Sequence, residues 1–348
     1  MHIVIATSQV PFVRGGAESH AEGLRDALVK AGHEAEIVAI PFKWYPPDRI
    51  LDQVLACRLL DVTESEGRPI DRLIALKFPA YYIRHPNKVL WILHQHRPAY
   101  DLWDSPLGDM NQYPNGSLVR EAICQADRRL IPEARAVFAS SRNVAERLKT
   151  YCGIEARPLY HPPPNADRFY AAEAQDYFFF PSRVTPNKRQ GLILEALAHS
   201  SEKVRVCFAS SSDHPTYYPE VKKLASKLGV EKRVEWLGAI SEGEKIERYA
   251  HALGVLYTPE DEDYGYVTLE AMLAAKPVIT CKDSGGSLEF VVDGETGLIS
   301  EATPKTLARA MEVLWKNRKL AVAMGQAGRE RYRDLGISWS RTIEALLA

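Results

Sequence analysis

Residues 254–277 read GVLYTPEDEDYGYVTLEAMLAAKP, and this stretch organises the second half of the chain. It begins with a short, mostly apolar run that ends at Pro259, which predicts a buried strand. The acidic, glycine-bearing EDEDYGY that follows predicts a loop. Residues 267–276 are helix-forming, carry apolar side chains at helical spacing and are followed by Pro277. The stretch therefore predicts a strand, a charged loop and a helix.

The same alternation extends through the rest of the sequence. A β-α-β unit opens the chain, with a strand over 2–7, a glycine pair, a helix over 17–31 and a strand over 34–40. Similar patterns follow, with strands predicted at 71–79, 88–94, 177–183, 204–210 and 233–238, and helices at 49–60, 190–199, 219–229 and 242–252. Alternating strands and helices predict an α/β fold with doubly wound, parallel sheets.

Two domains are expected, because 348 residues exceed what one ordinary hydrophobic core accommodates. Three consecutive prolines at 162–164 stiffen the chain and cannot continue a sheet, so they mark the boundary. We expect an N-terminal Rossmann-like domain over 1–165 and a C-terminal one over 166–330. The last segment, 331–348, contains a short amphipathic helix.

Composition narrows the class of protein. A net charge of -1 gives no support to binding of nucleic acid. The five cysteines are scattered without a C-x-x-C spacing, as a reducing compartment tolerates. The first residues lack the features of a signal peptide, and no apolar run is long enough to span a bilayer. We therefore expect a cytoplasmic enzyme, and peripheral contact with a membrane remains open.

A binding site is predicted where the charged loop meets the helix. A helix start at Gly265–Val267 offers free backbone N–H groups, which suit an anion. Glu262 and Glu270 lie on either side of this start, with seven residues between them. Because carboxylates repel phosphate, they fit better as acceptors for hydroxyl groups beside it, as on a ribose or a hexose.

The segment resembles a known family. Glu262 to Tyr266, with LEAM and PVI after them, resembles the E-x7-E segment of retaining glycosyltransferases of the GT-B fold, and most closely the family 4 pattern E-x-F-G-x4-E-A-M-A-x-G-x-P-V-I. Tyr264 replaces the usual Phe, and Ala275 replaces the usual Gly, which alters a helix C-terminus and not the chemistry. The resemblance implies two Rossmann-like domains facing across a cleft, and a C-terminal helix that packs back on the first domain.

Two basic residues follow the FFFP strand. Arg183 and Lys188 are spaced R-x4-K, which resembles the diphosphate clamp of the same family. Arginine holds two phosphate oxygens with its planar fork, and lysine adds a point charge. Without this context the two residues would be read as solvated surface charges. Arg189, next in the chain, is interpreted as a bystander.

The first half contributes fewer candidates. Gly15 and Gly16 precede the first helix and let a phosphate or sugar approach the backbone, although the incomplete G-x-G-x-x-G argues against a dinucleotide site. His94 ends the strand at 88–94, where ligands of parallel sheets bind. The resemblance implies that His94 faces the sugar, with His96 as the alternative. The pair lacks further ligands nearby, so no metal site is predicted.

The resemblance implies that the remaining candidates lie beside the nucleotide. Tyr264, Gly265, Tyr266 and Val267 form the loop and helix start beside the diphosphate. Trp236 ends a strand whose loop can hold the nucleobase through backbone groups, or else it simply packs. The turn at 284–287, SGGS, either contacts sugar or phosphate or serves as a scaffold.

The resemblance implies a retaining glycosyltransferase that moves a sugar from a UDP- or GDP-sugar to an unidentified acceptor, which is a sugar, a lipid-linked sugar or a small molecule. It implies a front-face mechanism without metal or cofactor, in which Arg183, Lys188 and the helix start stabilise the departing diphosphate. Glu270 would hold the ribose, and Glu262 the transferred sugar. The alternatives are a nucleotide-sugar epimerase or hydrolase of the same fold, and a non-catalytic scaffold with a decayed site.

Overall fold

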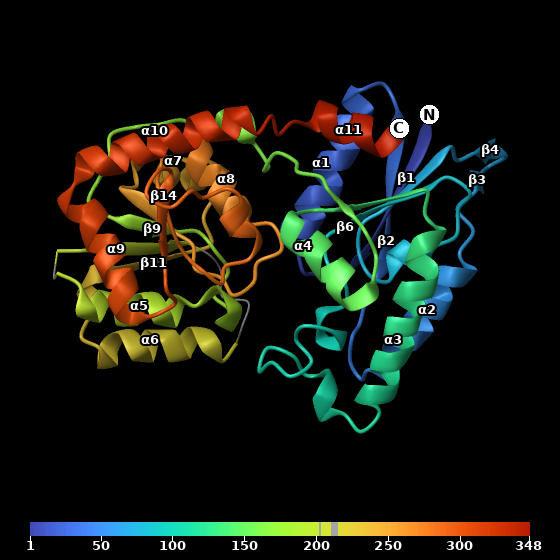
Figure 1. Cartoon of the computed structure of the whole chain (residues 1–348), viewed down its shortest axis with the longest axis horizontal. Helices are drawn as coiled ribbons and strands as arrows, with labels where there is room; N and C mark the ends of the chain where they lie inside the picture. The colour runs from blue at the N-terminus through green and yellow to red at the C-terminus, as the bar shows by residue number, and fades with distance from the viewer. Residues whose placement is uncertain (202, 210–214) are drawn as a thin grey trace. The chain divides into compact units, whose positions relative to one another are not determined.

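The computed structural model describes residues 1–201, 203–209 and 215–348, which form two compact units (Figure 1). The first unit comprises Met1–Pro164 and Ser338–Ala348, and the second comprises Asn165–Ile337. The chain leaves the first unit directly after its three prolines. It returns at Ser338 and not at residue 331, because the long helix α10 of the second unit continues to Asp334.

The first unit is built on a parallel sheet of six strands in the order β2-β1-β5-β6-β7-β8. The strands are β1 (His2–Gln9), β2 (Glu34–Pro41), β5 (Arg72–Ala75), β6 (Lys88–Ile92), β7 (Ala136–Ala139) and β8 (Arg157–Pro158). The helices are α1 (Gly16–Lys30), α2 (Asp48–Leu59), α3 (Gly116–Leu130), α4 (Arg142–Arg147) and α11 (Trp339–Leu347). A short hairpin of β3 (Glu64–Ser65) and β4 (Arg68–Pro69) follows α2.

The second unit repeats the plan with the strand order β11-β10-β9-β12-β13-β14. Its strands are β9 (Phe178–Phe180), β10 (Val206–Ala209), β11 (Val234–Gly238), β12 (Gly254–Leu256), β13 (Val278–Cys281) and β14 (Gly297–Ser300). Its helices are α5 (Gln190–His199), α6 (Tyr217–Lys227), α7 (Glu242–His251), α8 (Tyr266–Leu273), α9 (Pro304–Lys316) and α10 (Arg318–Asp334). The last residue of the predicted strand at 204–210 lies outside the described residues. The prediction of an α/β fold with doubly wound, parallel sheets is confirmed.

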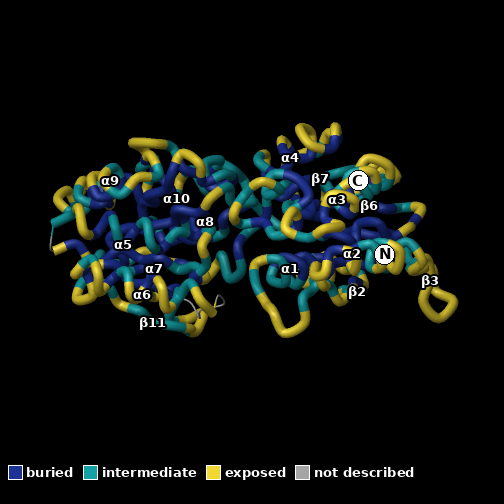
Figure 2. Tube along the Cα trace, turned by 90° about the horizontal axis from the view of Figure 1, so that it is seen from below, coloured by how far each residue is buried: buried dark blue, intermediate teal, exposed yellow. Residues whose placement is uncertain are grey.

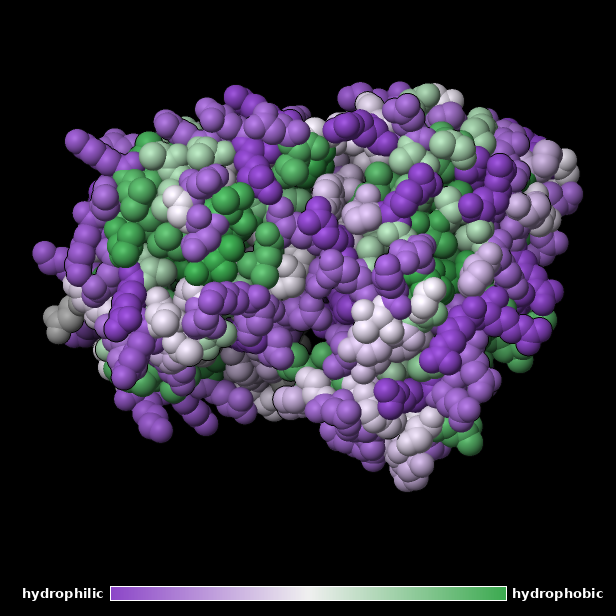
Figure 3. Space-filling view, in the orientation of Figure 1, coloured by the Kyte–Doolittle hydropathy of each residue, from purple (hydrophilic) through white to green (hydrophobic). Residues whose placement is uncertain are grey.

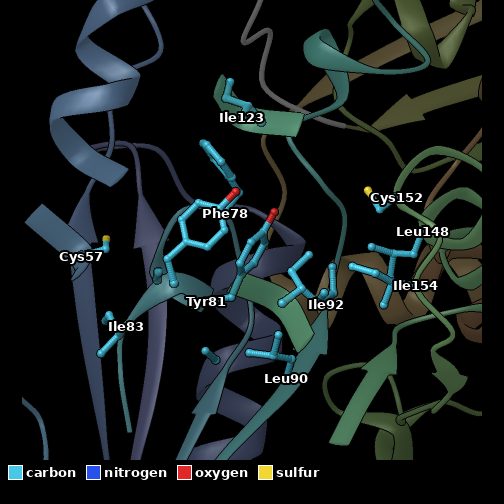
Figure 4. Close-up of a cluster of buried hydrophobic side chains, with 14 of the residues drawn as sticks. Cys57, Phe78, Tyr81, Ile83, Leu90, Ile92, Ile123, Leu148, Cys152 and Ile154 are labelled. Atoms are coloured by element: carbon cyan, nitrogen blue, oxygen red, sulfur yellow. The ribbon is translucent and has the colours of Figure 1, made fainter. Parts of the chain in front are cut away.

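The inner strands of both sheets, such as β5, β6, β9 and β12, are buried on both faces, which explains why they are apolar runs without polar alternation. In β9, Phe178 and Phe180 pack into the layer of α5, α6, α9 and α10, whereas Phe179 packs into the layer of α7 and α8. In β6, Leu90 and Ile92 belong to one core layer, and Trp91 to the other. Figure 2 shows buried residues running through the inner elements, and Figure 4 shows one of these layers in the first unit.

The C-terminal helix α11 belongs to the core of the first unit. Its Trp339, Ile343 and Leu346 pack with α1 in one layer. Gly23 on α1 makes room for the indole, since a Cβ there would lie 2.7 Å from a ring carbon of Trp339. The guanidinium of Arg72 donates to the carbonyls of Leu346 and Leu347 at 3.0 and 3.1 Å, which satisfies acceptors that a helix end leaves open.

A buried carboxylate ties α3 to three tyrosines of its own core layer, on the sheet face opposite α11. Asp127 is fully buried and accepts hydrogen bonds from the hydroxyls of Tyr81, Tyr82 and Tyr100 at 2.8, 2.6 and 2.6 Å. Burial raises the pKa of Asp127, although the three hydroxyl donors act in the opposite direction. The three phenols have a common acceptor, so the cluster depends on one side chain.

Helix α8 ends in a conformation that favours glycine. The N–H groups of Ala275 and Lys276 donate to the carbonyls of Met272 and Ala271 at 3.0 and 2.8 Å, which is the Schellman pattern. Ala275 has a φ of +52°, in the left-handed region that disfavours a Cβ. This geometry explains why the family pattern has glycine at this position.

The face shown in Figure 3 is predominantly hydrophilic, with hydrophobic residues gathered in smaller groups. Across residues 1–201, 203–209 and 215–348, no helix combines the length and the apolar character needed to cross a membrane.

We expect Asp127→Ala to lower the free energy of unfolding by at least about 3 kcal/mol, because three buried hydroxyl donors lose their acceptor. The control Tyr82→Phe removes one donor and leaves the carboxylate two others, so it should cost only about 1 kcal/mol. Urea unfolding followed by tryptophan fluorescence measures both changes. An equal cost for the two variants would contradict the common-acceptor role.

We expect Ala275→Gly to stabilise the protein by up to about 1 kcal/mol, because glycine relieves the left-handed strain at a partly offsetting entropic cost. The neighbouring Ala274 has a φ of -81°, so Ala274→Gly should instead destabilise by about 1 kcal/mol. Melting temperatures of the two variants test the opposite signs. A lower melting temperature for Ala275→Gly would show that the left-handed residue carries no relievable strain.

Candidate functional site

The candidate site of the second unit lies where two neighbouring strands end. Strands β9 and β12 pair in parallel, so their carboxyl ends lie at the same edge of the sheet. The loop after β9 carries Arg183 and Lys188, and the loop after β12 carries Glu262. The two loops are joined by a hydrogen bond of 2.8 Å from the N–H of Glu260 to the carbonyl of Asn187.

Lys188 and Glu262 form an ion pair at this edge. Their side chains are only 11% and 18% exposed. The hydroxyl of Tyr257 lies 3.2 Å from the lysine Nζ and donates to Glu262 Oε2 at 2.7 Å. Lys188, Tyr257 and Glu262 therefore form a connected group of one cation, one hydroxyl and one carboxylate.

The groups in this cluster shift each other's pKa values. Burial acts to raise the pKa of Glu262, but the attraction of Lys188 outweighs it and holds that pKa below its usual value. Burial, and then the carboxylate of Glu262, raise the pKa of Tyr257 well above its usual value. The phenol therefore stays protonated and can only donate to Glu262.

Glu270, on α8, has a similar pair of partners. Its carboxylate accepts from Lys245 Nζ at 3.0 Å and from the Tyr249 hydroxyl at 2.7 Å, both on α7. Glu270 is 5% exposed, and Lys245 also contacts Glu242 at 3.0 Å. Each glutamate of the E-x7-E segment is thus held by one lysine and one tyrosine hydroxyl.

Glycines let a third loop pack closely against the Glu262 loop. Gly265, the N-cap of α8, has a φ of +86°, and a Cβ there would lie 2.7 Å from Ser287 Oγ. A Cβ on Gly286 would lie 2.6 Å from the carbonyl oxygen of Asp263. The N–H of Gly286 donates to the Glu262 carbonyl at 2.7 Å. The turn at 284–287 is therefore a scaffold for the Glu262 loop.

Arg189 also has a structural role. Its guanidinium donates to both carboxylate oxygens of Asp283 at 2.9 Å and lies 3.1 Å from Glu260. It thereby ties together the loops that follow β9, β12 and β13. Arg183 is exposed, and its backbone carbonyl accepts from Gln190 at 2.8 Å. The two arginines thus differ, since Arg189 is tied into the scaffold while Arg183 presents an exposed side chain.

The aromatic candidates are engaged in packing. Trp236 stacks on Phe208 with ring centroids 4.6 Å apart and meets Tyr218 edge to face. A nucleobase contact at this strand end would therefore fall to the backbone after Trp236 and not to the indole. Tyr264 packs its ring edge to face against Tyr266 and Phe290, contacts that a phenylalanine ring would also make.

In the first unit, the glycine pair caps helix α1. Gly15 is the N-cap, in an extended conformation, and its N–H donates to the carboxylate of Glu18 at 2.7 Å. Gly16 is the first helical residue. A carboxylate at this helix start disfavours a second anion there, so the pair suits a sugar hydroxyl better than a phosphate.

The structure distinguishes the two histidines after β6. His94 is partly exposed, and its Nδ1 lies 2.6 Å from the carbonyl of Gln95, so Nδ1 carries the hydrogen. His96 is buried against the rings of Phe42 and Phe78. Burial lowers the pKa of His96 to about 3. His96 is therefore a core residue, and His94 is the more exposed of the two histidines.

The sequence interpretation missed the partners of the two glutamates. Tyr257 follows an apolar strand and looked like part of it. Lys245 and Tyr249 are spaced i, i+4 on α7, so they share one face of that helix. That spacing was a usable signal, but it did not identify α8 as the helix they would meet.

Among the described residues, no group of three or more His, Cys, Asp or Glu side chains is placed to hold a metal ion. The second unit places Lys188 beside Glu262, next to the helix that carries Glu270, with the exposed Arg183 on the same loop as Lys188. Cations and backbone N–H groups bind phosphate oxygens, and carboxylates accept hydroxyls. The arrangement can therefore hold a sugar ring on either side of a diphosphate.

Comparison with known proteins gives relatives for both sequence and fold. Residues 165–331 match the family model described as glycosyl transferases group 1. The alpha-1,3/1,6-mannosyltransferase ALG2 of Mus musculus is 38% identical over 118 residues, which are 34% of this chain and 28% of that protein. A D-inositol 3-phosphate glycosyltransferase of Kineococcus radiotolerans is 25% identical over 370 aligned positions, covering 94% of this chain and 80% of that protein. The alignments to the first three curated relatives span 27% to 40% of their length.

Two solved structures cover nearly the whole chain. Sucrose-phosphate synthase of Thermosynechococcus elongatus superposes with a TM-score of 0.77 at 15% identity, covering 99% of this chain and 97% of that one. HepE of Anabaena, solved with UDP-glucose, superposes with a TM-score of 0.72 at 17% identity, covering 100% and 98%. At such identities the likeness concerns the fold, which is GT-B. Residues 165–331, just under half of the chain, are similar to the glycosyl transferases group 1 family.

Proposed function

We propose that this chain is a glycosyltransferase that moves a sugar from a nucleotide diphosphate sugar to an acceptor. The observation that carries the proposal is the group of Lys188, Tyr257 and Glu262 beside the N-terminus of α8, with Glu270 further along that helix. Relatives named as a mannosyltransferase and as an inositol phosphate glycosyltransferase support it. HepE, solved with UDP-glucose, supports a nucleotide-sugar donor.

The hard step is departure of the diphosphate while the anomeric carbon gains positive charge. Lys188, Arg183 and the first N–H groups of α8 would stabilise the leaving phosphate oxygens. Glu270 would accept the ribose hydroxyls, and Glu262 the hydroxyls of the transferred sugar. Cationic side chains and a helix dipole here take the role that a metal has elsewhere, so we propose metal-independent transfer.

The Lys188–Glu262 ion pair adds a condition on donor binding. In the protein without ligand, the lysine is engaged with the carboxylate. A diphosphate must draw Lys188 away, which would leave Glu262 buried without its cation and costs free energy. A sugar hydroxyl on the same ligand compensates by donating to Glu262. A complete nucleotide sugar therefore satisfies both groups, whereas a nucleoside diphosphate satisfies only one.

We further propose that the sugar retains its anomeric configuration through a front-face reaction. Double displacement needs a carboxylate close to the anomeric carbon. Glu262, held by Lys188 and Tyr257, has a lowered pKa and is better suited to stabilising positive charge. His94, whose Nδ1 donates to a carbonyl, is the residue of the first unit that we propose contacts the sugar. A UDP- or GDP-sugar is the proposed donor.

We expect Glu262→Gln to bind UDP or GDP at least as tightly as the wild type, because Lys188 is released from its ion pair, while turnover of the nucleotide sugar falls by about a hundredfold or more. Lys188→Ala should weaken nucleotide binding by about tenfold or more, since a charged hydrogen bond is lost. Isothermal titration calorimetry with and without magnesium measures binding, and release of nucleoside diphosphate measures turnover.

The matched control is Lys316→Ala, which removes an exposed lysine from a pair on α9 and should change neither quantity. A wild type that binds no nucleotide would be a scaffold. Conversion of the donor into another nucleotide sugar, without release of nucleoside diphosphate, would identify an epimerase. Weaker nucleotide binding in Glu262→Gln would contradict the competition for Lys188.

We expect the two buried tyrosines to affect different parts of the donor. Tyr249→Phe removes a hydrogen bond to the ribose-side Glu270, so it should weaken nucleoside diphosphate and nucleotide sugar equally, by about fivefold. Tyr257→Phe should weaken the nucleotide sugar more than the nucleoside diphosphate. The control is Tyr177→Phe, whose hydroxyl donates to the carbonyl of Arg248 at 2.8 Å, away from both carboxylates. Equal effects of Tyr249→Phe, Tyr257→Phe and Tyr177→Phe would reject the assignment of Glu270 to the ribose and Glu262 to the sugar.

A further inference from the structure

A polar cavity lies in the first unit, at the amino ends of the strands. It encloses about 630 Å³, within the range of small-molecule sites. Its lining includes Arg58, Asp61, Arg84, His85, Lys88 and Glu133. These residues come from the end of α2, the segment before β6 and the turn before β7 (Figure 1).

Lys88, the first residue of β6, is 1% exposed. An ammonium has three hydrogens to donate. The contacts of Nζ are long, at 3.4 Å to the carbonyl of Tyr81 and 3.6 Å to Glu133 Oε2. A buried cation with two such weak contacts is poorly compensated, because burial removes the hydration that the contacts should replace.

The acidic residues of the cavity are already engaged. Arg58 donates to both oxygens of Glu133, at 2.7 and 3.1 Å. Asp61 accepts from the N–H and the hydroxyl of Thr63 at 2.9 and 2.6 Å. Arg58 therefore neutralises Glu133, and the charges of Lys88 and Arg84 exceed the remaining charge of Asp61 by one.

Arg84 lies at the outer side of the cavity. Its side chain is exposed and makes no hydrogen bond or ion pair with the described part of the chain. His85, beside it, is fixed in its neutral form, since Nδ1 accepts from the N–H of Asn87 at 3.0 Å and Nε2 then donates to the carbonyl of Ile70. An arginine fork and a buried ammonium in one cavity are the groups that bind phosphate.

We propose that this cavity binds the phosphate group of a small ligand, with Lys88 and Arg84 as the direct contacts. The phosphate would supply the acceptors that Lys88 lacks, and Arg58 would remain with Glu133. Strand β6 separates this cavity from His94, since the two lie beyond opposite ends of its five residues. The site is therefore independent of the proposed transferase chemistry.

The phosphate can belong to a free metabolite or to a lipid headgroup. Leu55 and Leu59 on α2 are 60% and 75% exposed, and Leu59 also lines the cavity. Exposed leucines beside a phosphate site would suit acyl chains. Binding of a lipid headgroup should depend on these leucines, whereas binding of a free metabolite should not.

The first experiment titrates inorganic phosphate, and separately sulfate, into the full chain carrying Lys188→Ala, which removes the lysine of the other proposed phosphate site. Binding should persist in this background and weaken about tenfold or more when Lys88→Met or Arg84→Ala is added. Arg84→Ala alters an exposed side chain, so a folding defect cannot explain its effect. Lys149→Ala, an exposed pair with Glu155, is the control and should leave binding unchanged.

Sulfate also tests the role of Lys88 through pH, because its own charge is constant above about pH 3. Burial lowers the pKa of Lys88 to about 8. The charged groups around it are Arg58, Arg84, Asp61 and Glu133, and burial lowers the pKa of the neighbouring His85. Hydrogen bonds from Thr63 lower the pKa of Asp61, and against the effect of burial Arg58 and Lys88 lower that of Glu133. Sulfate affinity should therefore fall as the pH rises past about 8, and this fall should disappear in Lys88→Met.

Vesicles of phosphatidylcholine with and without phosphatidic acid distinguish the sources. Sedimentation with the acidic vesicles that is lost in both Arg84→Ala and Leu59→Asp identifies a lipid headgroup. Binding of free phosphate without sedimentation identifies a metabolite. The proposal is overturned if neither probe binds, or if binding is unchanged by Lys88→Met and Arg84→Ala. If the phosphate cavity fails this test, the nucleotide-binding measurements on Lys188 and Glu262 still stand, because those residues lie in the second unit.

Discussion

The parallel pairing of β9 with β12 is the constraint on which the candidate site depends. It places the loops with Lys188 and Glu262 at one edge of the sheet, where the two charges meet with little exposure to solvent. The neighbouring β13 then supplies a turn whose glycines approach the same loop. Without this strand order, a lysine and a glutamate 74 positions apart would be ordinary surface charges.

The ion pair also shapes how the site responds to ligands. A buried pair contributes little net stability, because each charge loses its hydration. Removing one partner is costly, because the other charge is left buried and unpaired. A ligand that offers a new partner to both the lysine and the glutamate avoids that cost. Tyr257 and Lys245 extend this logic, because their hydrogen bonds hold the two carboxylates in place before any ligand arrives.

The sequence alone predicted a large part of this arrangement. The strand-helix alternation was sufficient for the fold class, because buried parallel strands are apolar throughout and helices have their own spacing. The E-x7-E segment and the R-x4-K spacing identified the loops of the site. Ala275 was correctly read as a change at a helix end, and its left-handed φ gives the reason.

The contacts that depend on tertiary packing were not predictable in the same way. Tyr249 and Lys245 gain their role from the approach of α7 to α8, and no local pattern reports that approach. His94 and His96 were equivalent in sequence, and only the aromatic surroundings of His96 separate them. The cavity at Lys88 was missed for the same reason, since a lysine at a strand start looks like a solvated charge.

The return of the chain to the first unit affects the order in which the two units can complete their folding during synthesis. The second unit is complete at Ile337, before the ribosome has released α11. Until that helix arrives, Arg72 has no carbonyls of Leu346 and Leu347 to bond, and the α1 side of the first sheet lacks its Trp339. Domains generally fold as units during synthesis. The first unit therefore begins to fold first and completes its fold last. The part of its apolar layer that α11 covers stays exposed while the second unit is synthesised.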